Sequence, residues 1–190
     1  AAEVKDFDPA QNLGRKTAKN LDRFSQFALV ASLEALNHSG IQINSVNCEN
    51  VAVRIGSGVG GIITISEQMD TLNVKGPTRV SPFLVPKMLG DMAASQVSMH
   101  LGIKGSSICT VSSCCSGGDA IGDAYELIKR GDAVVALAGG AEAAICPIAI
   151  AGFNSCKALS TQNDDPQQAS RPFDSRRDGF VLGEGSGMLL

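Results

Sequence analysis

The chain has 190 residues, of which 44% are apolar and 18% charged, so it is long enough to fold around one substantial core and too apolar to be disordered. Its net charge of −3 argues against a basic field that would attract nucleic acid or anionic membranes, and no apolar stretch is long enough to span a bilayer. Six cysteines without a CxxC pair, far from both histidines, predict no metal site and a reducing, intracellular compartment.

The first third of the chain predicts two helices around a strand. Residues 16 to 38 form a helical pattern that is apolar around most of its circumference, and Ser39-Gly40 ends it. Residues 51 to 55 read as a strand that ends in the glycine-rich turn 56 to 61, after which apolar residues recur at helical spacing. A proline-rich loop then precedes another predicted helix over about residues 86 to 101.

A second strand, turn and helix follow in the middle of the chain. Residues 107 to 111 predict a strand, residues 112 to 118 a turn, and an amphipathic helix ends at Gly131. Residues 133 to 138 show no alternation, as in a strand covered on both faces. The repeated order predicts an α/β fold, with one domain over residues 1–190 and a mostly parallel or mixed sheet between helices.

Neither end of the chain resembles a domain boundary. Residues 1 to 15 supply no strand, and the chain stops inside the apolar run 188 to 190. We therefore expect a truncated module that lacks its first strand.

Cys114 stands between a predicted buried strand and the first turn of the next helix. Free backbone N–H groups and the positive end of the helix dipole favour a thiolate there, and the same N–H groups can hold the oxyanion of a thioester. This placement predicts acyl transfer with Cys114 as nucleophile, although spacing alone also allows two packed thiols at a helix start. Cys115, one residue further round the helix, is expected to be packed, and Cys109 to be structural.

Five segments around Cys114 carry a pattern that covers almost the whole chain: residues 111–122, 131–142, 152–161, 170–174 and 177–185. This pattern resembles the thiolase-fold condensing enzymes, and specifically the elongating β-ketoacyl-acyl carrier protein synthases of fatty-acid synthesis. Ser113 departs from the alanine usual before the nucleophile. The resemblance implies a layered αβαβα fold with only its N-terminal half present, and no cofactor, because substrates arrive on the phosphopantetheine of acyl carrier protein.

The resemblance also implies a two-step reaction. Cys114 takes an acyl chain from the carrier thioester, and the carbanion of decarboxylated malonyl-carrier protein then attacks the acyl-enzyme. The family's two catalytic histidines and lysine lie in the missing half, so this chain alone is expected to be inactive in condensation. His38 and His100 match no catalytic position and are expected to be structural. A homodimer through the edge strand before Cys114, in the cytoplasm or a plastid stroma, is expected.

Two further groups of residues match family positions. The expected acyl pocket is formed by Gly58, Val59, Leu84, Ser113, Ala144, Ala149 and Phe153, with Leu84 reached from a dimer partner. The expected carrier-protein contacts are Lys16, Lys19, Arg79 and Lys157. Lys16 and Lys19 belong to a basic cluster with Arg15 and Arg23 near the start of the first predicted helix, whereas Arg79 and Lys157 lie elsewhere in the sequence. The alternative for the pocket residues is ordinary core packing, and the alternative for the cations is a solvated basic face. Because exposed ion pairs are individually weak, these cations would steer association more than they would fix affinity.

Other functions remain open at this point. Residues 56–61 satisfy GxGxxG, which indicates a dinucleotide-binding enzyme, but a basic loop replaces the acidic residue expected about 20 positions later. A cysteine protease needs a partner histidine, and the helices of His38 and His100 are predicted to be buried. Within the family, a polyketide ketosynthase, a thiolase relative and a non-catalytic folding or dimerisation half are alternatives, although residues 158–166 favour fatty-acid elongation.

Overall fold

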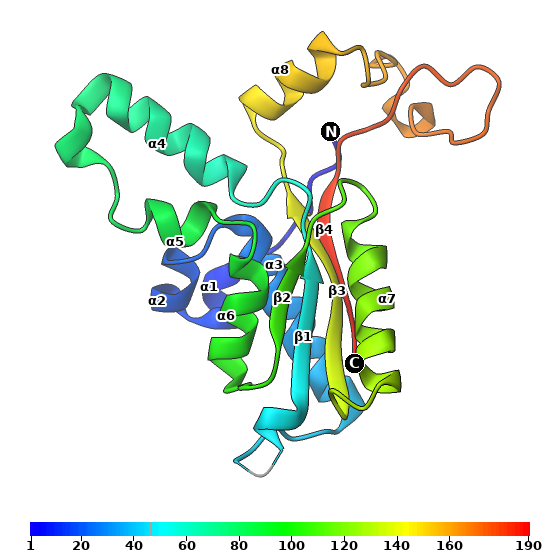
Figure 1. Ribbon diagram of the computed structural model, residues 1–190. Coiled ribbons are helices and arrows are strands. Elements are labelled where there is room, and N and C mark those ends of the chain that lie inside the picture. Colours follow the sequence, from blue (N-terminus) through cyan, green and yellow to red (C-terminus); the bar gives the residue numbers. More distant parts are fainter. Residues whose placement is uncertain (46) are drawn as a thin grey trace.

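The computed structural model describes residues 1–45 and 47–190 and shows a four-stranded sheet in the order β2-β1-β3-β4 (Figure 1). β1 (Val51–Gly56) lies parallel to both β2 (Ser107–Thr110) and β3 (Val135–Ala143). β4 (Glu184–Leu189), which the sequence did not predict as a strand, pairs antiparallel with β3. The predicted α/β class with a mostly parallel sheet is confirmed.

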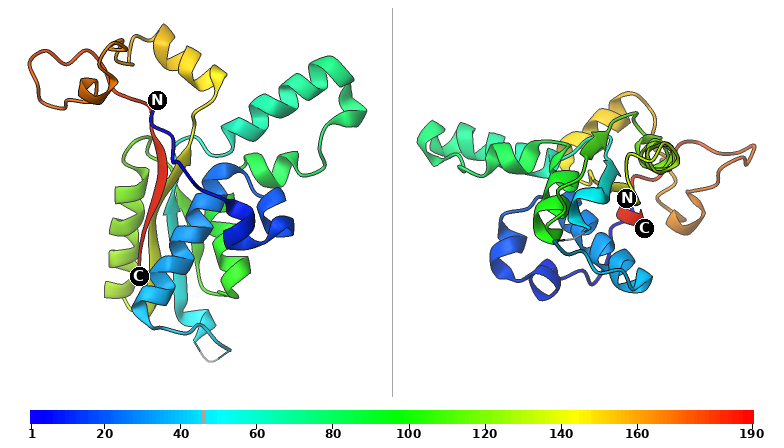
Figure 2. Two further views of the ribbon diagram at one scale, coloured as in Figure 1. Left: turned by 180° about the vertical axis from the view of Figure 1, so that it is seen from behind. Right: turned by 60° about the horizontal axis from the view of Figure 1, so that its bottom comes forward.

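Helices cover both faces of this sheet. α3 (Arg23–Ser39) and α6 (Met92–Leu101) pack against one face, and α7 (Ser116–Lys129) packs against the other (Figure 2). Alternate side chains of β1 serve the two faces: Val53 joins the core beneath α3 and α6, whereas Ala52 joins the cluster beneath α7. Every residue of β1 is therefore buried, as a central strand of a doubly covered sheet requires.

Two predicted helices have different bounds. α1 (Pro9–Leu13) and α2 (Arg15–Lys19) are separate short helices, and α3 begins only at Arg23 because the Asp22 carboxylate accepts the Phe24 N–H at its start. The helix expected over residues 86 to 101 is two helices, α5 (Leu84–Met88) and α6. The Met88 carbonyl accepts the Gly61 N–H, and Leu89 is extended, so the chain breaks between them.

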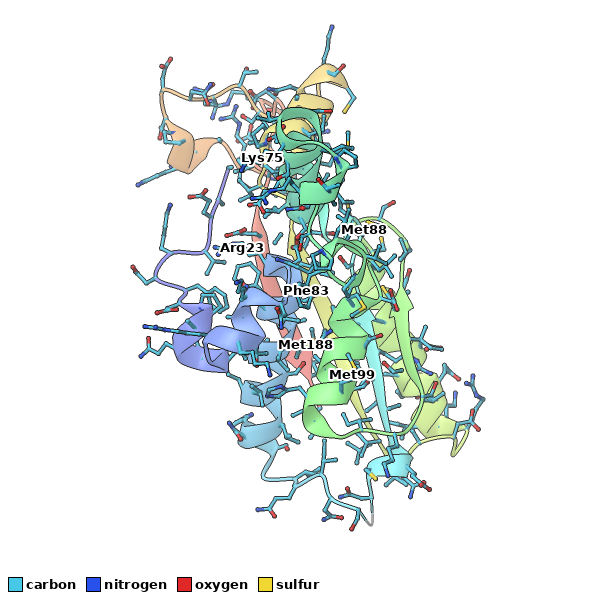
Figure 3. All side chains as sticks on the ribbon, turned by 90° about the vertical axis from the view of Figure 1, so that its left-hand side faces the viewer. Arg23, Lys75, Phe83, Met88, Met99 and Met188 are labelled. Carbon is cyan, nitrogen blue, oxygen red and sulfur yellow. The ribbon has the colours of Figure 1, made fainter. Side chains whose placement is uncertain are left out.

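One part of the molecule projects from this body. α4 (Ile62–Lys75), the 3-10 turn η2 (Pro77–Arg79) and α5 form an extension that we call the arm (Figure 1). Figure 3 views the molecule from the arm's side, with Lys75, Phe83 and Met88 of the arm labelled. Large apolar side chains of α4, among them Ile65, Met69 and Leu72, are exposed. The arm therefore carries an apolar face that the described residues do not cover.

The remaining elements are short. They are the 3-10 turn η1 (Cys48–Asn50), the helix α8 (Pro147–Ser155) and the 3-10 turn η3 (Pro166–Gln168). Residues 156–183 connect α8 to β4 beyond the carboxyl end of the parallel strands (Figure 1). In the part of the chain that the structure describes, no helix is long and apolar enough to cross a membrane.

Candidate active site

The parallel strands bring three chain segments to one edge of the sheet. Because β1, β2 and β3 run in the same direction, the residues that follow them meet at their carboxyl ends, where open α/β sheets bind ligands. A cavity of about 640 Å³ lies there, within the range of small-molecule sites. Its lining comprises Gly56, Ser57, Gly58, Val59, Ser113, Cys114, Ser116, Gly117, Gly140, Ala141, Glu142, Ala144, Phe153, Phe180, Leu182, Gly185, Ser186 and Gly187.

The turn that carries Cys114 is held by Ser116, the first residue of α7. The Ser116 hydroxyl accepts the Ser112 N–H at 2.9 Å and donates to the Ser113 carbonyl at 2.6 Å. Ser113 has a φ of 56°, a left-handed conformation that costs a non-glycine residue about 1 kcal/mol. The buried Ser116 thus stabilises a turn that is strained at Ser113. Cys114, the residue after Ser113, is exposed at the cavity.

The neighbouring cysteines differ in exposure. Cys115 is exposed, so the expectation that it is packed was wrong: it lies at the N-cap of α7 rather than within the helix, where one side would face the sheet. Cys109 in β2 is half-buried, and burial raises the pKa of its thiol, which disfavours the thiolate. Cys114 is the one cysteine of the described residues that lines this cavity.

Glu142, near the end of β3, also lines the cavity. Its carboxylate accepts the Gly58 N–H at 2.7 Å and the Val59 N–H at 3.1 Å, and the Ser57 hydroxyl donates to it at 3.2 Å. A dinucleotide phosphate would need these same N–H groups of the glycine-rich turn. Because a carboxylate already holds them, the geometry argues against the dinucleotide hypothesis.

The structure brings most of the predicted pocket residues together. Gly58, Val59, Ser113, Ala144 and Phe153 all line the cavity with Cys114. Two others do not. Ala149 packs with Ala144 and Cys146 in a small cluster behind the wall, and Leu84 lies on the arm, outside the cavity lining.

Other lining residues were not predicted. The Phe180 ring meets the Phe153 ring edge to face, with centroids 5.2 Å apart, and Leu182 adds to the same apolar wall. Phe180 lies in one of the segments that carry the family resemblance, which was its only signal in the sequence. Glu142 likewise lies in a segment that carries the resemblance, residues 131–142. Nothing else in the sequence indicated its place at the cavity, because its hydrogen-bond partners lie more than 80 positions earlier.

The predicted carrier-protein residues are all exposed. Lys16 and Lys19 lie on α2, Arg79 ends η2, and Lys157 follows α8. Arg23, in the same predicted basic cluster, is instead engaged. It binds Glu184 at 2.6 Å, and this hydrogen-bonded ion pair raises the pKa of Arg23, while the Glu184 side chain is only 2% exposed. Arg23 therefore fixes α3 to β4.

Other titratable groups lie away from the cavity. His38 and His100 are exposed in the last turns of α3 and α6, and neither lines the cavity. Both helices bury residues in the core, as predicted, and the two histidines lie at their exposed ends. Hydrogen bonds from Ser160 and Thr161 lower the pKa of Asp178 and tie two parts of the 156–183 segment together. Residues 1–45 and 47–190 contain no cluster of three or more histidine, cysteine or acidic side chains that could hold a metal ion.

Comparisons with known proteins agree with this geometry. Residues 1–190 match the family model described as the β-ketoacyl synthase N-terminal domain. The chain is 50% identical over 188 residues to 3-oxoacyl-acyl-carrier-protein synthase 2 of Synechocystis sp., covering 99% of this chain and 45% of that protein. For the Staphylococcus aureus protein of the same name, identity is 46% over 190 residues, covering 100% of this chain and 47% of the relative.

A solved structure gives the same result. The crystal structure of a β-ketoacyl synthase from Burkholderia phymatum STM815 superimposes with a TM-score of 0.88 at 36% identity, covering 100% of this chain and 46% of that one. The chain spans about half the length of the curated relatives it matches.

Proposed function

This chain belongs to the β-ketoacyl synthase family, through that family's N-terminal domain, and on this premise we propose that it supplies the acyl-accepting site of a 3-oxoacyl-acyl-carrier-protein synthase. The observation that carries the proposal is the placement of Cys114. An exposed thiol follows a strained residue, precedes the first turn of α7 and borders a largely apolar cavity. A fatty acyl chain is the substrate class that such a cavity fits.

In the first step, the Cys114 thiolate attacks the thioester carbonyl of an acyl chain carried on phosphopantetheine. The C–S bond to Cys114 forms, the tetrahedral oxyanion collapses, and the pantetheine thiolate leaves and takes up a proton. Backbone N–H groups at the start of α7 and the positive end of its dipole stabilise negative charge at this point. The acyl chain then lies along Val59, Ala144 and Phe153.

In the second step, malonyl-carrier protein loses carbon dioxide and its carbanion attacks the acyl-Cys114 carbonyl. The new C–C bond forms, and the thiolate of Cys114 leaves, which regenerates the nucleophile. Neither histidine of this chain lies at the cavity to assist decarboxylation. We therefore expect this chain to form the acyl-cysteine and to need further residues for condensation.

Two partners follow from the same proposal. The carrier protein, which is acidic in the family, would meet the exposed cations Lys16, Lys19, Arg79 and Lys157, and this attraction would mainly accelerate association. A second copy would pair with β2, an edge strand of the sheet, where Ile108 of the strand and Val111 directly after it are exposed. In such a dimer Leu84 would reach the other copy's pocket. We place the protein in the cytoplasm or a plastid stroma, since its cysteines are free.

The test is intact-mass labelling with a short acyl thioester, comparing the wild type with Cys114→Ala and with Cys115→Ala as the matched control. We expect a single label that only Cys114→Ala abolishes, because Cys115 is exposed but does not line the cavity. Labelling that survives in Cys114→Ala, or that only Cys115→Ala abolishes, would contradict the assignment.

A further inference from the structure

Glu142 is a charged side chain in a largely apolar cavity to which neither step of the reaction assigns a role. We propose that Glu142 is a positioning residue that fixes the Gly58–Val59 wall of the cavity against the turn carrying Cys114, so that an acyl chain can bind beside the thiol. The inference rests on the proposed function, since it concerns the same cavity.

The contacts of Glu142 are directed at one short segment. Oε2 accepts the N–H groups of Gly58 and Val59, and the Ser57 hydroxyl donates to Oε1 while accepting the Gly60 N–H at 3.1 Å. Four consecutive residues of the turn are thereby joined, directly or through Ser57, to one side chain of β3. Removing the carboxylate would leave two N–H groups and one hydroxyl without this acceptor, so the turn would lose the hydrogen bonds that hold it to β3.

The turn also packs against the backbone of Ser113, the residue before Cys114. A Cβ on Gly58 would lie 3.0 Å from Oε2 of Glu142 and 3.2 Å from the Ser113 carbonyl oxygen. The Gly58 backbone therefore fills the space between Glu142 and the residue that precedes Cys114. A shift of the carboxylate would move both the cavity wall at Val59 and the surroundings of the strained Ser113 peptide.

The bonding pattern indicates geometry rather than acid–base chemistry. The ion pairs of the described residues do not include Glu142, and its oxygens face backbone and hydroxyl donors. What the turn requires is an acceptor at a fixed reach. A glutamine oxygen can accept the same two N–H bonds, whereas an aspartate keeps the charge but is one methylene too short.

This difference makes the proposal testable in the full-length protein. The variants are Glu142→Gln, Glu142→Asp and Glu142→Ala, with Glu126→Ala, an exposed acid on α7, as the matched control. Transfer of a hexadecanoyl group to Cys114 is followed by intact mass, and alkylation by iodoacetamide reports the reactivity of the thiol alone. Hydrogen exchange at Gly58 and Val59 gives a readout that does not depend on activity.

We expect Glu142→Ala and Glu142→Asp to lower the acyl-transfer rate roughly tenfold relative to alkylation, as a misplaced binding wall does. Exchange at Gly58 and Val59 should rise in both variants, and Glu142→Gln should restore most of the rate and the protection. If Glu142→Ala does not fold, Glu142→Asp carries the comparison. Equal losses in Glu142→Gln and Glu142→Asp, or unchanged transfer in Glu142→Asp, would overturn the proposal. A wild type that takes no acyl group would instead refute the proposed function.

Discussion

α4 and α7 are two helices of equal length with different surroundings. Each has 14 residues and follows a parallel strand and a small-residue turn. α7 lies along the sheet and buries Ala120, Ala124 and Leu127, whereas α4 extends away in the arm and buries only Thr64 among its residues (Figure 1). A strand, turn and helix pattern therefore does not decide where the helix goes.

The first turn of each helix accounts for the difference. At α7, glycines allow the backbones to touch: a Cβ on Gly56 would lie 2.1 Å from the Ser116 carbonyl oxygen, so β1 and the start of α7 are in direct contact. At α4, a Cβ on Gly61 would lie 2.2 Å from the Lys87 carbonyl oxygen. α4 is thus attached to α5 instead of the sheet. The helix that follows Cys114 is therefore the one in direct backbone contact with the sheet, whereas the start of α4 reaches the body through the hydrogen bonds from Thr64 to the Asp22 carboxylate.

The largest effect should come from filling the contact that fixes α7. In Gly56→Ala the added methyl overlaps the backbone of Ser116 and Gly117, so β1 and α7 must separate. We expect the free energy of unfolding to fall by about 3 kcal/mol, as in severe overpacking, and acylation of Cys114 to be lost. Urea denaturation and mass labelling measure both, with Gly152→Ala on α8, which has open space around it, as control. Full acylation in Gly56→Ala would show that this contact does not set the site.

Truncating a leucine on the apolar face of each helix should have a smaller effect on stability, and the effect should differ between α7 and α4. Leu127 of α7 is 7% exposed and Leu72 of α4 is 37% exposed. We expect Leu127→Ala to lower the free energy of unfolding by about 2 to 3 kcal/mol, and Leu72→Ala to lower it by less than about 1 kcal/mol in dilute protein. Urea denaturation at two protein concentrations measures the free energy of unfolding of both variants and the wild type. A cost for Leu72→Ala that rises with concentration would show that a second copy covers the arm, and equal costs in dilute protein would contradict the open arm.

The comparison also shows what the sequence could predict. Periodicity located both helices and three of the four strands, because burial on a sheet imposes its own pattern, although β3 (Val135–Ala143) continues five residues beyond the predicted end at Ala138. It could not predict the direction of α4, which depends on a backbone contact with Lys87 some 25 positions later. β4 was missed because three consecutive small residues, Gly185 to Gly187, precede its two apolar residues, so the segment shows neither alternation nor the β-branched residues that indicate a strand.

In the candidate site, too, the residues in local segments could be predicted and the contacts between distant segments could not. Cys114 and five of the predicted pocket residues were identified from local segments and a family resemblance, and the structure places them around one cavity. The hydrogen bond between Gly58 and Glu142 joins residues that are 84 positions apart in the sequence. A local sequence pattern carries no information about a contact over that separation. The exposure of Cys115 was also mispredicted, because a one-residue difference in the start of α7 moves it from the helix to its cap.

The smallest predicted effect concerns the outer face of α7 and has a sign that depends on assembly. Ile121, Tyr125 and Ile128 are exposed there, with Tyr125 at 63%. Apart from its chain neighbours and the backbone of its own helix, no atom of the described residues lies within 4 Å of a Cβ placed on Gly122. Gly122→Ala should therefore raise the stability of the monomer by about 0.5 to 1 kcal/mol, since alanine favours a helix.

The same methyl should weaken a dimer that packs this face, beside the edge strand β2, against a second copy. Thermal unfolding of dilute protein and sedimentation at several concentrations separate the two effects, again with Gly152→Ala as control. A stabilised monomer with a weaker dimer would place the interface on α7 and β2. A stabilised monomer with an unchanged dimer would place it on the arm, because the arm's α4 bears the other exposed apolar helix face described above. A monomer that loses stability would show that the outer face of α7 is not open at Gly122.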